Sequence, residues 1–159
     1  MKKKSPSKKK KVVMVSGGFD PIHVGHIRLL QEAKKLGDEL VVLLNNDHWL
    51  KLKKGFVFMS EFERKEIIEA FHFVDRVVLS SHKKNTKDIS VIEDIRVLRP
   101  HVFAKGGDRH SGNIPELEIC NEVGCVVVND VGWGGKVQSS SELVKKAKLK
   151  KPARRDGKK

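Results

Sequence analysis

Short apolar runs and amphipathic stretches alternate along the chain, and this pattern predicts a series of strands and helices. Apolar runs rich in β-branched residues, typical of buried strands, occur at 12–15, 39–44, 76–79, 101–104 and 125–129. Stretches with apolar residues every three or four positions predict helices at 24–36, 60–71, 88–98, 114–123 and from about 139. Strands separated by helices indicate an α/β fold, a Rossmann-like five-stranded parallel sheet with helices on both faces, in a single domain.

Two of the helix starts carry a capping signal, in which a serine is followed three residues later by a glutamate. These signals are Ser60-Glu61-Phe62-Glu63 and Ser139-Ser140-Ser141-Glu142. The segment 49–55 contains three lysines and is predicted to be a polar loop.

Four predicted loops follow the ends of strands, namely 17–26, 45–47, 105–109 and 132–141. In parallel sheets, ligands bind beyond the carboxyl ends of the strands. We therefore expect these loops to meet at one edge of the sheet and to form a single site.

The first of these loops reads Gly-Gly-Phe-Asp-Pro-Ile-His-Val-Gly-His and leads directly into a predicted helix. Backbone N–H groups at a helix N-terminus attract anions. His23 and His26 lie three residues apart and share one helix face, and Gly25 between them lets a ligand approach the backbone. The string therefore predicts a phosphate-binding turn. Helix caps and metal ligands are the alternatives, but no third histidine or cysteine has a suitable spacing, so we predict no protein-held metal.

The string from Gly18 to His26 resembles the signature of the HxGH nucleotidyltransferase superfamily, cytidylyltransferase-like branch. Over roughly residues 11–147, the chain is similar to glycerol-3-phosphate cytidylyltransferases and to the adenylyltransferase domain of ADP-heptose synthesis. Segments 36–42 and 73–78 are similar to the second- and third-strand regions of these enzymes, and Glu63-Arg64 to their loop-to-helix arginine. Segments 98–100 and 105–108 resemble the heptose-type enzymes, and 137–141 stands at the family's Ile-Ser-Ser/Thr-Ser/Thr motif.

This resemblance implies that an acceptor phosphate attacks the α-phosphorus of CTP or ATP and releases pyrophosphate. The acceptor would be a sugar or polyol phosphate, such as glycerol 3-phosphate or heptose 1-phosphate. Mg²⁺ would bridge the phosphates mainly through substrate oxygens, and the enzyme would be a homodimer. The implied catalytic residues are His23, His26, Lys53, Lys54 and Arg64. The implied nucleotide-binding residues are Gly17, Gly18, Phe19, Asp20, Gly25, Asp108, Ser139, Ser140 and Ser141.

One segment departs from the family pattern. Many cytidylyltransferases carry Arg-Thr-Glu-Gly just before the serine motif, whereas this chain reads Gly-Trp-Gly-Gly-Lys over 132–136. Lys136 is the cation available to replace the missing arginine, and the choice between CTP and ATP stays open. Lys105, Arg109 and Lys136 are the candidates for contact with the acceptor.

The net charge of +13 comes from the two ends of the chain. Residues 1–11 hold 7 lysines and no acid, and residues 144–159 hold 9 lysines or arginines and one aspartate. The segment between them holds 17 basic and 19 acidic residues. We therefore expect a domain over 11–148 between two basic disordered tails, 1–10 and 149–159. The basic charge of the tails predicts nonspecific contact with polyanions, and the alternative is that the tails only increase solubility.

Two cysteines, Cys120 and Cys125, are too few for a disulfide framework and fit free thiols in a reducing compartment. No apolar run approaches the roughly 20 residues of a membrane span, and no signal-peptide segment follows the lysine-rich start. We expect a cytoplasmic protein, with nuclear targeting through the basic tail as an alternative.

Three functions are compatible with the sequence. The first is a nucleotidyltransferase, and the second is a nucleotide-binding or regulatory module with reduced turnover, which the missing arginine suggests. The third is a nucleic-acid-associated protein, which the tails suggest. The complete phosphate-binding string favours the enzyme.

Overall fold

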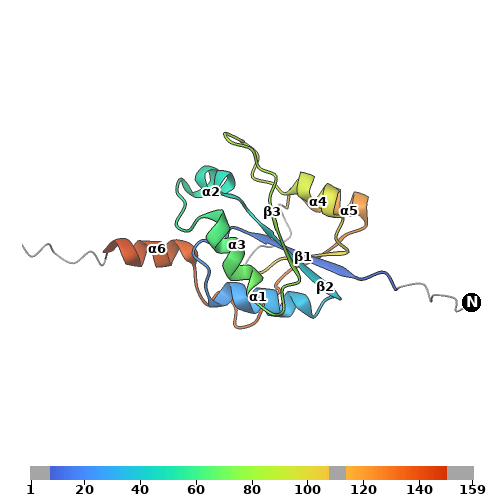
Figure 1. The fold of residues 1–159 in the computed structure, drawn as a ribbon. Helices are drawn as coiled ribbons and strands as arrows, with labels where there is room; N and C mark the ends of the chain where they lie inside the picture. Colours follow the sequence, from blue (N-terminus) through green and yellow to red (C-terminus); the bar gives the residue numbers. More distant parts are fainter. Residues whose placement is uncertain (1–7, 108–113, 150–159) are drawn as a thin grey trace, which may run out of the picture.

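The structure is a computed structural model, and it describes residues 8–107 and 114–149. Its centre is a five-stranded sheet in the order β3-β2-β1-β4-β5, in which neighbouring strands run parallel (Figure 1). The strands are β1 (Val12–Gly17), β2 (Glu39–Leu44), β3 (Arg76–Leu79), β4 (Val102–Ala104) and β5 (Val126–Val128). The predicted five-stranded parallel sheet is confirmed.

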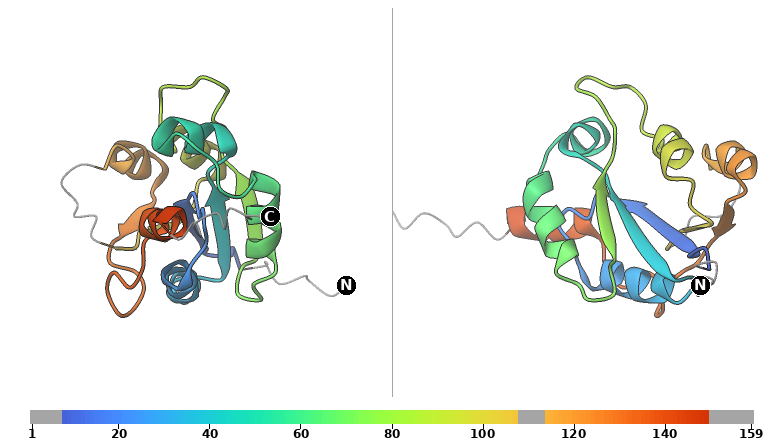
Figure 2. Two further views of the ribbon diagram at one scale, coloured as in Figure 1. Left: turned by 90° about the vertical axis from the view of Figure 1, so that its left-hand side faces the viewer. Right: turned by 45° about the vertical axis from the view of Figure 1, so that its right-hand side comes forward.

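Helices cover both faces of this sheet (Figure 2). The helices α1 (Val24–Lys34) and α3 (Glu61–Glu69) pack on one face, and α4 (Ile92–Leu98) and α5 (Leu117–Val123) pack on the other. Side chains of β1 alternate between the two cores: Val13 and Val15 face the first pair of helices, and Met14 faces the second. All three are fully buried, so the apolar run of this strand is explained by a sheet covered on both faces.

The segment 49–55, predicted as a loop, is instead the greater part of a helix, α2 (Asp47–Lys54), and its cap. Asn46 caps the start by accepting a hydrogen bond from the Trp49 N–H (3.0 Å), and Gly55 ends the helix in the left-handed conformation (φ 78°). Trp49 and Leu50 are buried and hold the helix against the body. The loop prediction was wrong because lysines alternate with the apolar residues here and obscure the helical period.

Two other helices begin later than predicted. Before α4, Ser90 donates its backbone N–H to the Asp88 carboxylate (2.8 Å), and such local side-chain bonds compete with helix formation. Before α5, Ile114 precedes Pro115, and the residue before a proline is disfavoured in helical conformation.

The capping box predicted at 60–63 is confirmed at the start of α3, where Ser60 and Glu63 exchange hydrogen bonds. At α6 (Ser140–Leu149), the Ser139 hydroxyl accepts from the Glu142 N–H (3.5 Å). This last helix extends away from the sheet (Figure 1). None of the helices within 8–107 and 114–149 is long and apolar enough to cross a membrane.

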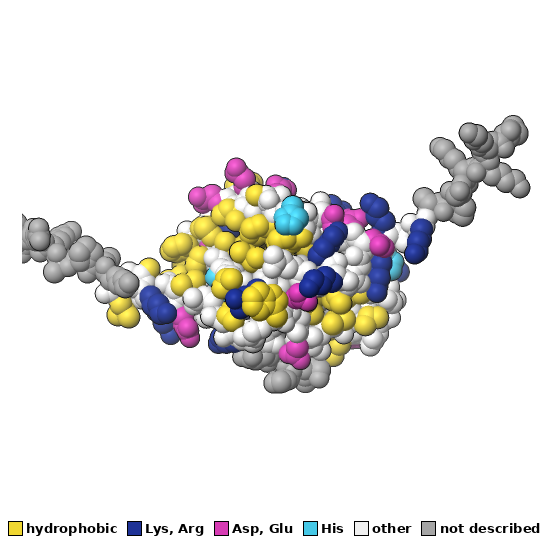
Figure 3. Space-filling view, turned by 90° about the horizontal axis from the view of Figure 1, so that it is seen from below, with side chains coloured by type: hydrophobic (Ala, Val, Ile, Leu, Met, Phe, Trp, Pro, Cys, Tyr) yellow, Lys and Arg dark blue, Asp and Glu magenta, His cyan; other side chains and the backbone are white. Residues whose placement is uncertain are grey.

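Charged side chains of both signs are interspersed over the face that Figure 3 shows, beside a group of hydrophobic side chains. This agrees with the nearly balanced charge of the segment 12–143. Most of both predicted tails (1–7 and 150–159) lies outside the described residues. Cys120 and Cys125 are buried free thiols, and burial raises the pKa of Cys125 to about 12.

Candidate active site

The four loops expected to form one site do line a common cavity, with a volume of about 630 Å³. Gly18 comes from the first loop, Asn45 from the second, Gly106 from the third and Val137 from the fourth. The cavity lies at the carboxyl edge of the sheet because each of these loops follows a strand. Its volume falls within the roughly 300–1,000 Å³ of small-molecule sites.

His23 and His26 build the start of α1 together. His23 is the N-cap, and its Nδ1 accepts a hydrogen bond from the Gly25 N–H (3.1 Å). Nδ1 of His26 accepts one from the His23 N–H (3.2 Å), so two histidines form a capping box. Their rings stack with centroids 3.7 Å apart, and both residues line the cavity. The helix start thus fixes both imidazoles at the predicted phosphate site.

Both imidazoles are neutral near pH 7. Burial lowers the pKa of His26 to about 3, and the neighbouring His23 and Lys54 act in the same direction. Burial and the Lys54 charge also lower the pKa of His23. A neutral imidazole has one donor and one acceptor nitrogen, so Nε2 carries the proton in each ring, because Nδ1 accepts from the backbone. The site therefore offers two N–H donors at the positive end of a helix.

Lys53 and Lys54 line the cavity from the last turn of α2 rather than from a loop. Lys53 is exposed, whereas Lys54 is half-buried. Burial lowers the pKa of Lys54, Asp20 opposes this effect, and Arg64 adds to it. Since Lys54 also lowers the pKa of both histidines, its charge acts directly on the phosphate-binding turn.

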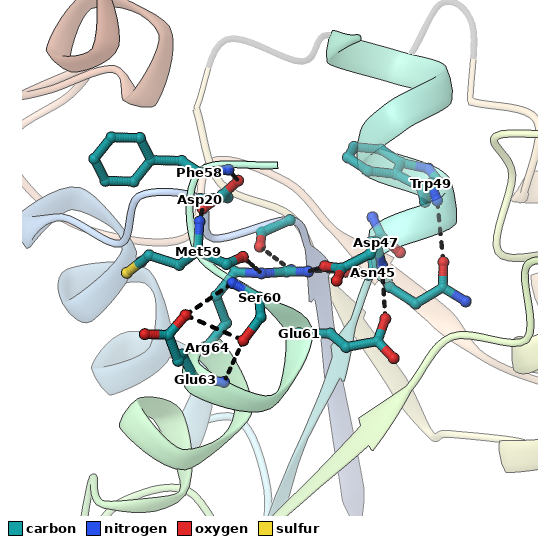
Figure 4. Close-up of polar contacts among 12 residues, drawn as sticks. Asp20, Asn45, Asp47, Trp49, Phe58, Met59, Ser60, Glu61, Glu63 and Arg64 are labelled. Carbon is teal, nitrogen blue, oxygen red and sulfur yellow. Dashed lines mark hydrogen bonds and ion pairs between the residues drawn. The ribbon is translucent and has the colours of Figure 1, made fainter. Parts of the chain in front are cut away.

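Arg64 is only 1% exposed, and its guanidinium lies among its hydrogen-bond partners (Figure 4). Its Nη1 donates to the carbonyls of Gly18 (2.6 Å) and Asn45 (2.7 Å), and its Nη2 donates to the Asp47 carboxylate (2.6 Å). Its Nε donates to the Met59 carbonyl (2.9 Å). The guanidinium thus connects the loops after β1 and β2 to the segment before α3. Arg64 is not among the residues that line the cavity.

Asp20 also supports the site from below. Its carboxylate is buried and accepts hydrogen bonds from the backbone N–H groups of Phe58 and Met59 (both 2.7 Å). These bonds tie the phosphate-binding turn to the segment before α3 (Figure 4). Phe19, which does line the cavity, packs its ring edge-on against His26 with the centroids 4.9 Å apart.

The three serines of the last motif occupy different places. Ser140 lines the cavity, and its hydroxyl donates to the Pro21 carbonyl (2.8 Å). Ser139 and Ser141 are described but do not line the cavity. Ser140 therefore fixes the start of α6 against the phosphate-binding turn.

The part of the cavity lining that comes from α1 and the loop 132–136 contains an arginine that the sequence motifs did not indicate. Arg28, on α1, lines the cavity with its guanidinium carbon 3.6 Å from the centre of the Trp133 ring. Gly134 leaves room for this stack, because a Cβ there would lie 2.8 Å from Arg28 Nη1. Arg28 thus places a guanidinium beside the loop that lacks the family's arginine. No motif marks it, and only the fold brings it to this loop.

Two of the three residues predicted to contact the acceptor lie in the cavity lining. Lys105 and Lys136 line the cavity, and Lys105 Nζ lies 3.5 Å from the carboxylate of Glu116, a second cavity residue that the sequence did not reveal. Asp108 and Arg109 lie outside the described residues.

Comparison with known families identifies the family of this chain. The family model described as cytidylyltransferase-like matches residues 14–147, which include the phosphate-binding turn and the serine motif. The chain belongs to the cytidylyltransferase-like family. The resemblance noted in the sequence, to nucleotidyltransferases of this branch, is confirmed.

Two relatives and one solved structure are similar to this chain over most of its length. Bifunctional protein HldE of Campylobacter jejuni subsp. doylei is 36% identical over 146 residues, covering 91% of this chain and 29% of HldE. FAD synthase of Thermococcus sibiricus is 34% identical over 145 residues, covering 88% of this chain and 95% of that protein. A crystal structure of a lipopolysaccharide core biosynthesis protein from Thermoplasma volcanium superposes with a TM-score of 0.62 at 27% identity, covering 79% of this chain and 100% of that one.

Proposed function

We propose that this member of the cytidylyltransferase-like family transfers AMP from ATP to a small phosphorylated acceptor and releases pyrophosphate. The observation that carries the proposal is the pair of neutral histidines, His23 and His26, which present N–H donors at the start of α1 beside the Lys54 ammonium. Such preorganised donors stabilise negative charge that develops on phosphate oxygens.

In the proposed reaction, an oxygen of the acceptor phosphate attacks the α-phosphorus of ATP. The bond from that phosphorus to the oxygen bridging to the β-phosphorus breaks, and pyrophosphate leaves with the electron pair. His23 and His26 donate to the phosphate oxygens, and Lys54 offsets the charge that builds on the leaving group. Arg64 acts as a positioning residue, because its bonds hold the loops that carry these groups. No nucleophile from the protein is needed, so positioning and electrostatics supply the catalysis.

ATP is proposed over CTP because of the FAD synthase relative, since FAD is formed by joining AMP to a flavin phosphate. The loop 132–136, where the arginine of the CTP enzymes is missing, carries Trp133, which stacks on Arg28, and both residues line the cavity. The acceptor is either a sugar or polyol phosphate or, by the same relative, flavin mononucleotide (FMN).

Magnesium fits this reaction as an ion held by the substrate. No group of three or more histidine, cysteine or acidic side chains suited to a metal occurs in the described part of the chain. Mg²⁺ accepts one or two protein ligands or none when phosphates and waters complete its shell. It would enter with ATP, neutralising phosphate charge beside Lys54.

The test is pyrophosphate release, with ATP and CTP each crossed against glycerol 3-phosphate, heptose 1-phosphate and FMN. We expect release with ATP and at least one acceptor, and loss of release in His26→Ala. Tight ATP binding without pyrophosphate release for any acceptor would favour a nucleotide-binding regulatory module over an enzyme. Full activity of His23→Ala and His26→Ala would contradict the assigned chemistry.

A further inference from the structure

Arg28 lines the cavity with a guanidinium that has no hydrogen bond or ion pair in the part of the chain that the structure describes. Its Nε is buried and unpaired, whereas Nη1 and Nη2, also without a hydrogen bond there, keep accessible surface. Glu32, one turn later on α1, pairs with Lys35 (2.6 Å) instead. Buried charges are normally paired, so an anion that enters the cavity would supply the partner that this guanidinium lacks.

The Trp133 ring holds the guanidinium without using its donors. The guanidinium carbon lies 3.6 Å from the centre of the ring, and Gly134 leaves space for Nη1, which would lie 2.8 Å from a Cβ there. The N–H groups of a guanidinium lie in its plane, so a stack on an aromatic face leaves them free to donate at the edge. The stack therefore orients a fork of donors before a ligand binds, which reduces the entropy lost on binding.

A strip of small and apolar residues connects Arg28 with the phosphate-binding turn. Arg28 follows Gly25 by three positions on α1, so the two residues share a helix face. A Cβ at Gly25 would lie 3.0 Å from the His23 ring and 3.4 Å from Val137, and a Cβ at Gly134 would lie 3.3 Å from Val137. His23, Gly25, Val137 and Arg28 all line the cavity. An extended anion bound at the histidines therefore has a path along this strip to the guanidinium.

We propose that Arg28 binds the triphosphate of the nucleotide and supplies the guanidinium that the loop 132–136 lacks. This inference rests on the proposed function, in which His23 and His26 donate to phosphate oxygens at the start of α1. A guanidinium forks onto two phosphate oxygens, and such charge-assisted hydrogen bonds are stronger than neutral ones. Lys136 also lines the cavity, but it is exposed and its ammonium is a point charge without this fork.

The experiment measures binding to the full chain by calorimetry, with ATP and with inorganic tripolyphosphate, which has three phosphates but no base or ribose. Arg28→Met should weaken the binding of both ligands roughly ten- to hundredfold, because hydrogen bonds between charged groups are lost. Arg28→Lys keeps the charge but not the fork, and should recover only part of the loss. Thermal unfolding of Arg28→Met should change little, since Arg28 has no hydrogen bond to lose within the described residues.

Arg96→Met is the matched control, because Arg96 is exposed, pairs with Glu93 and does not line the cavity. It removes one positive charge and should leave both affinities unchanged. Equal losses in Arg28→Met and Arg96→Met would show a general effect of charge and overturn the inference. Weaker binding of ATP with unchanged binding of tripolyphosphate would assign Arg28 to the base or ribose, and a change in the acceptor KM alone would assign it to the acceptor. Either result also overturns the inference.

The binding measurements do not require turnover, so the two proposals fail in different ways. If no acceptor supports pyrophosphate release but tripolyphosphate binding still depends on Arg28, the proposed function fails and this inference is supported. If pyrophosphate is released and the ATP KM is unchanged in Arg28→Met, the proposed function is supported and this inference is overturned.

Discussion

The phosphate-binding turn and the glycine-rich loop 132–136 line the same cavity but are held in different ways. In the turn, the N–H donors and the Nδ1 acceptors lie two or three residues apart in the sequence, as in the bonds of His23 with Gly25 and His26. The loop instead meets α1 through the stack of Trp133 on Arg28, a residue more than a hundred positions earlier. The turn is therefore specified by a short motif, whereas the loop depends on how the whole sheet brings α1 beside it.

The largest expected effect concerns the support beneath the turn. Arg64→Met should destabilise the fold by about 3–5 kcal/mol, because it leaves the Asp47 carboxylate and two buried carbonyls without their donor. The control is Arg76→Met, since Arg76 is half-exposed and lies 3.5 Å from Glu39, and should cost at most about 1 kcal/mol. Chemical denaturation measures both. Equal small losses would mean that the turn does not depend on its buried arginine.

The next largest effect falls on the turn itself. His23→Ala should lower kcat by roughly 10²–10³, the usual cost of one preorganised donor, together with a loss of about 1 kcal/mol in stability because His23 is also the N-cap. Exposed His72→Ala is the matched control and should change neither. Steady-state pyrophosphate release and thermal unfolding are the measurements.

The two lysines at the end of α2 differ in burial, because Lys54 is half-buried and Lys53 is exposed. Lys54→Met should lower kcat by about 10²-fold, because its half-buried ammonium lines the cavity and is proposed to offset the charge on the leaving pyrophosphate. Exposed Lys53→Met should have a smaller effect, and Lys51→Met, which does not line the cavity, should have none. The same kinetic assay ranks the three variants, and a reversed ranking would show that the exposed lysine carries the charge.

The histidine pair should also make the protein sensitive to acid. His26 has a pKa of about 3 in the folded state against an ordinary value of 6.5, so between these values the unfolded state binds a proton that the folded state excludes. The neutral His26 therefore costs no stability above pH 6.5. Below that pH, the free energy of unfolding falls as the pH falls, by at most about 1.4 kcal/mol per pH unit.

His26→Gln keeps an acceptor at the capping-box position and removes the titration. Denaturation at pH 6.5, 5.5 and 4.5 should therefore show a shallower loss of stability for this variant than for the wild type. Parallel curves for the two proteins would mean that His26 does not control the acid response.

The smallest effect is expected in the glycine-rich loop. Trp133→Leu removes a cation–π stack worth about 0.5–2 kcal/mol, and should raise the ATP KM by roughly 2- to 30-fold with little change in kcat. Gly134→Ala should act in the same direction, because its Cβ would lie 2.8 Å from Arg28 Nη1 and its φ of 84° favours glycine. A fall in kcat alone would assign this loop to the chemistry rather than to nucleotide binding.

Much of the architecture follows from local pattern. Apolar runs predicted all five strands, since a strand buried on both faces needs consecutive apolar residues, as Val13, Met14 and Val15 show. The helix α2 escaped prediction because its stability comes from burying Trp49 and Leu50, while its surface lysines dominate the sequence. Short-range side-chain bonds at Asp88 and the proline at 115 shortened two other helices.

By itself, the sequence determined the sheet and the phosphate-binding turn, because strand periodicity and the bonds of His23 and His26 involve residues close along the chain. Only the tertiary structure decided the remaining roles. It buried Arg64 as a support, brought Arg28 to the loop that lacks an arginine, and put Asn45 in the cavity wall. The physical reason is that burial and pairing depend on segments far apart in the sequence, whose approach is fixed by the packing of the sheet and its helices.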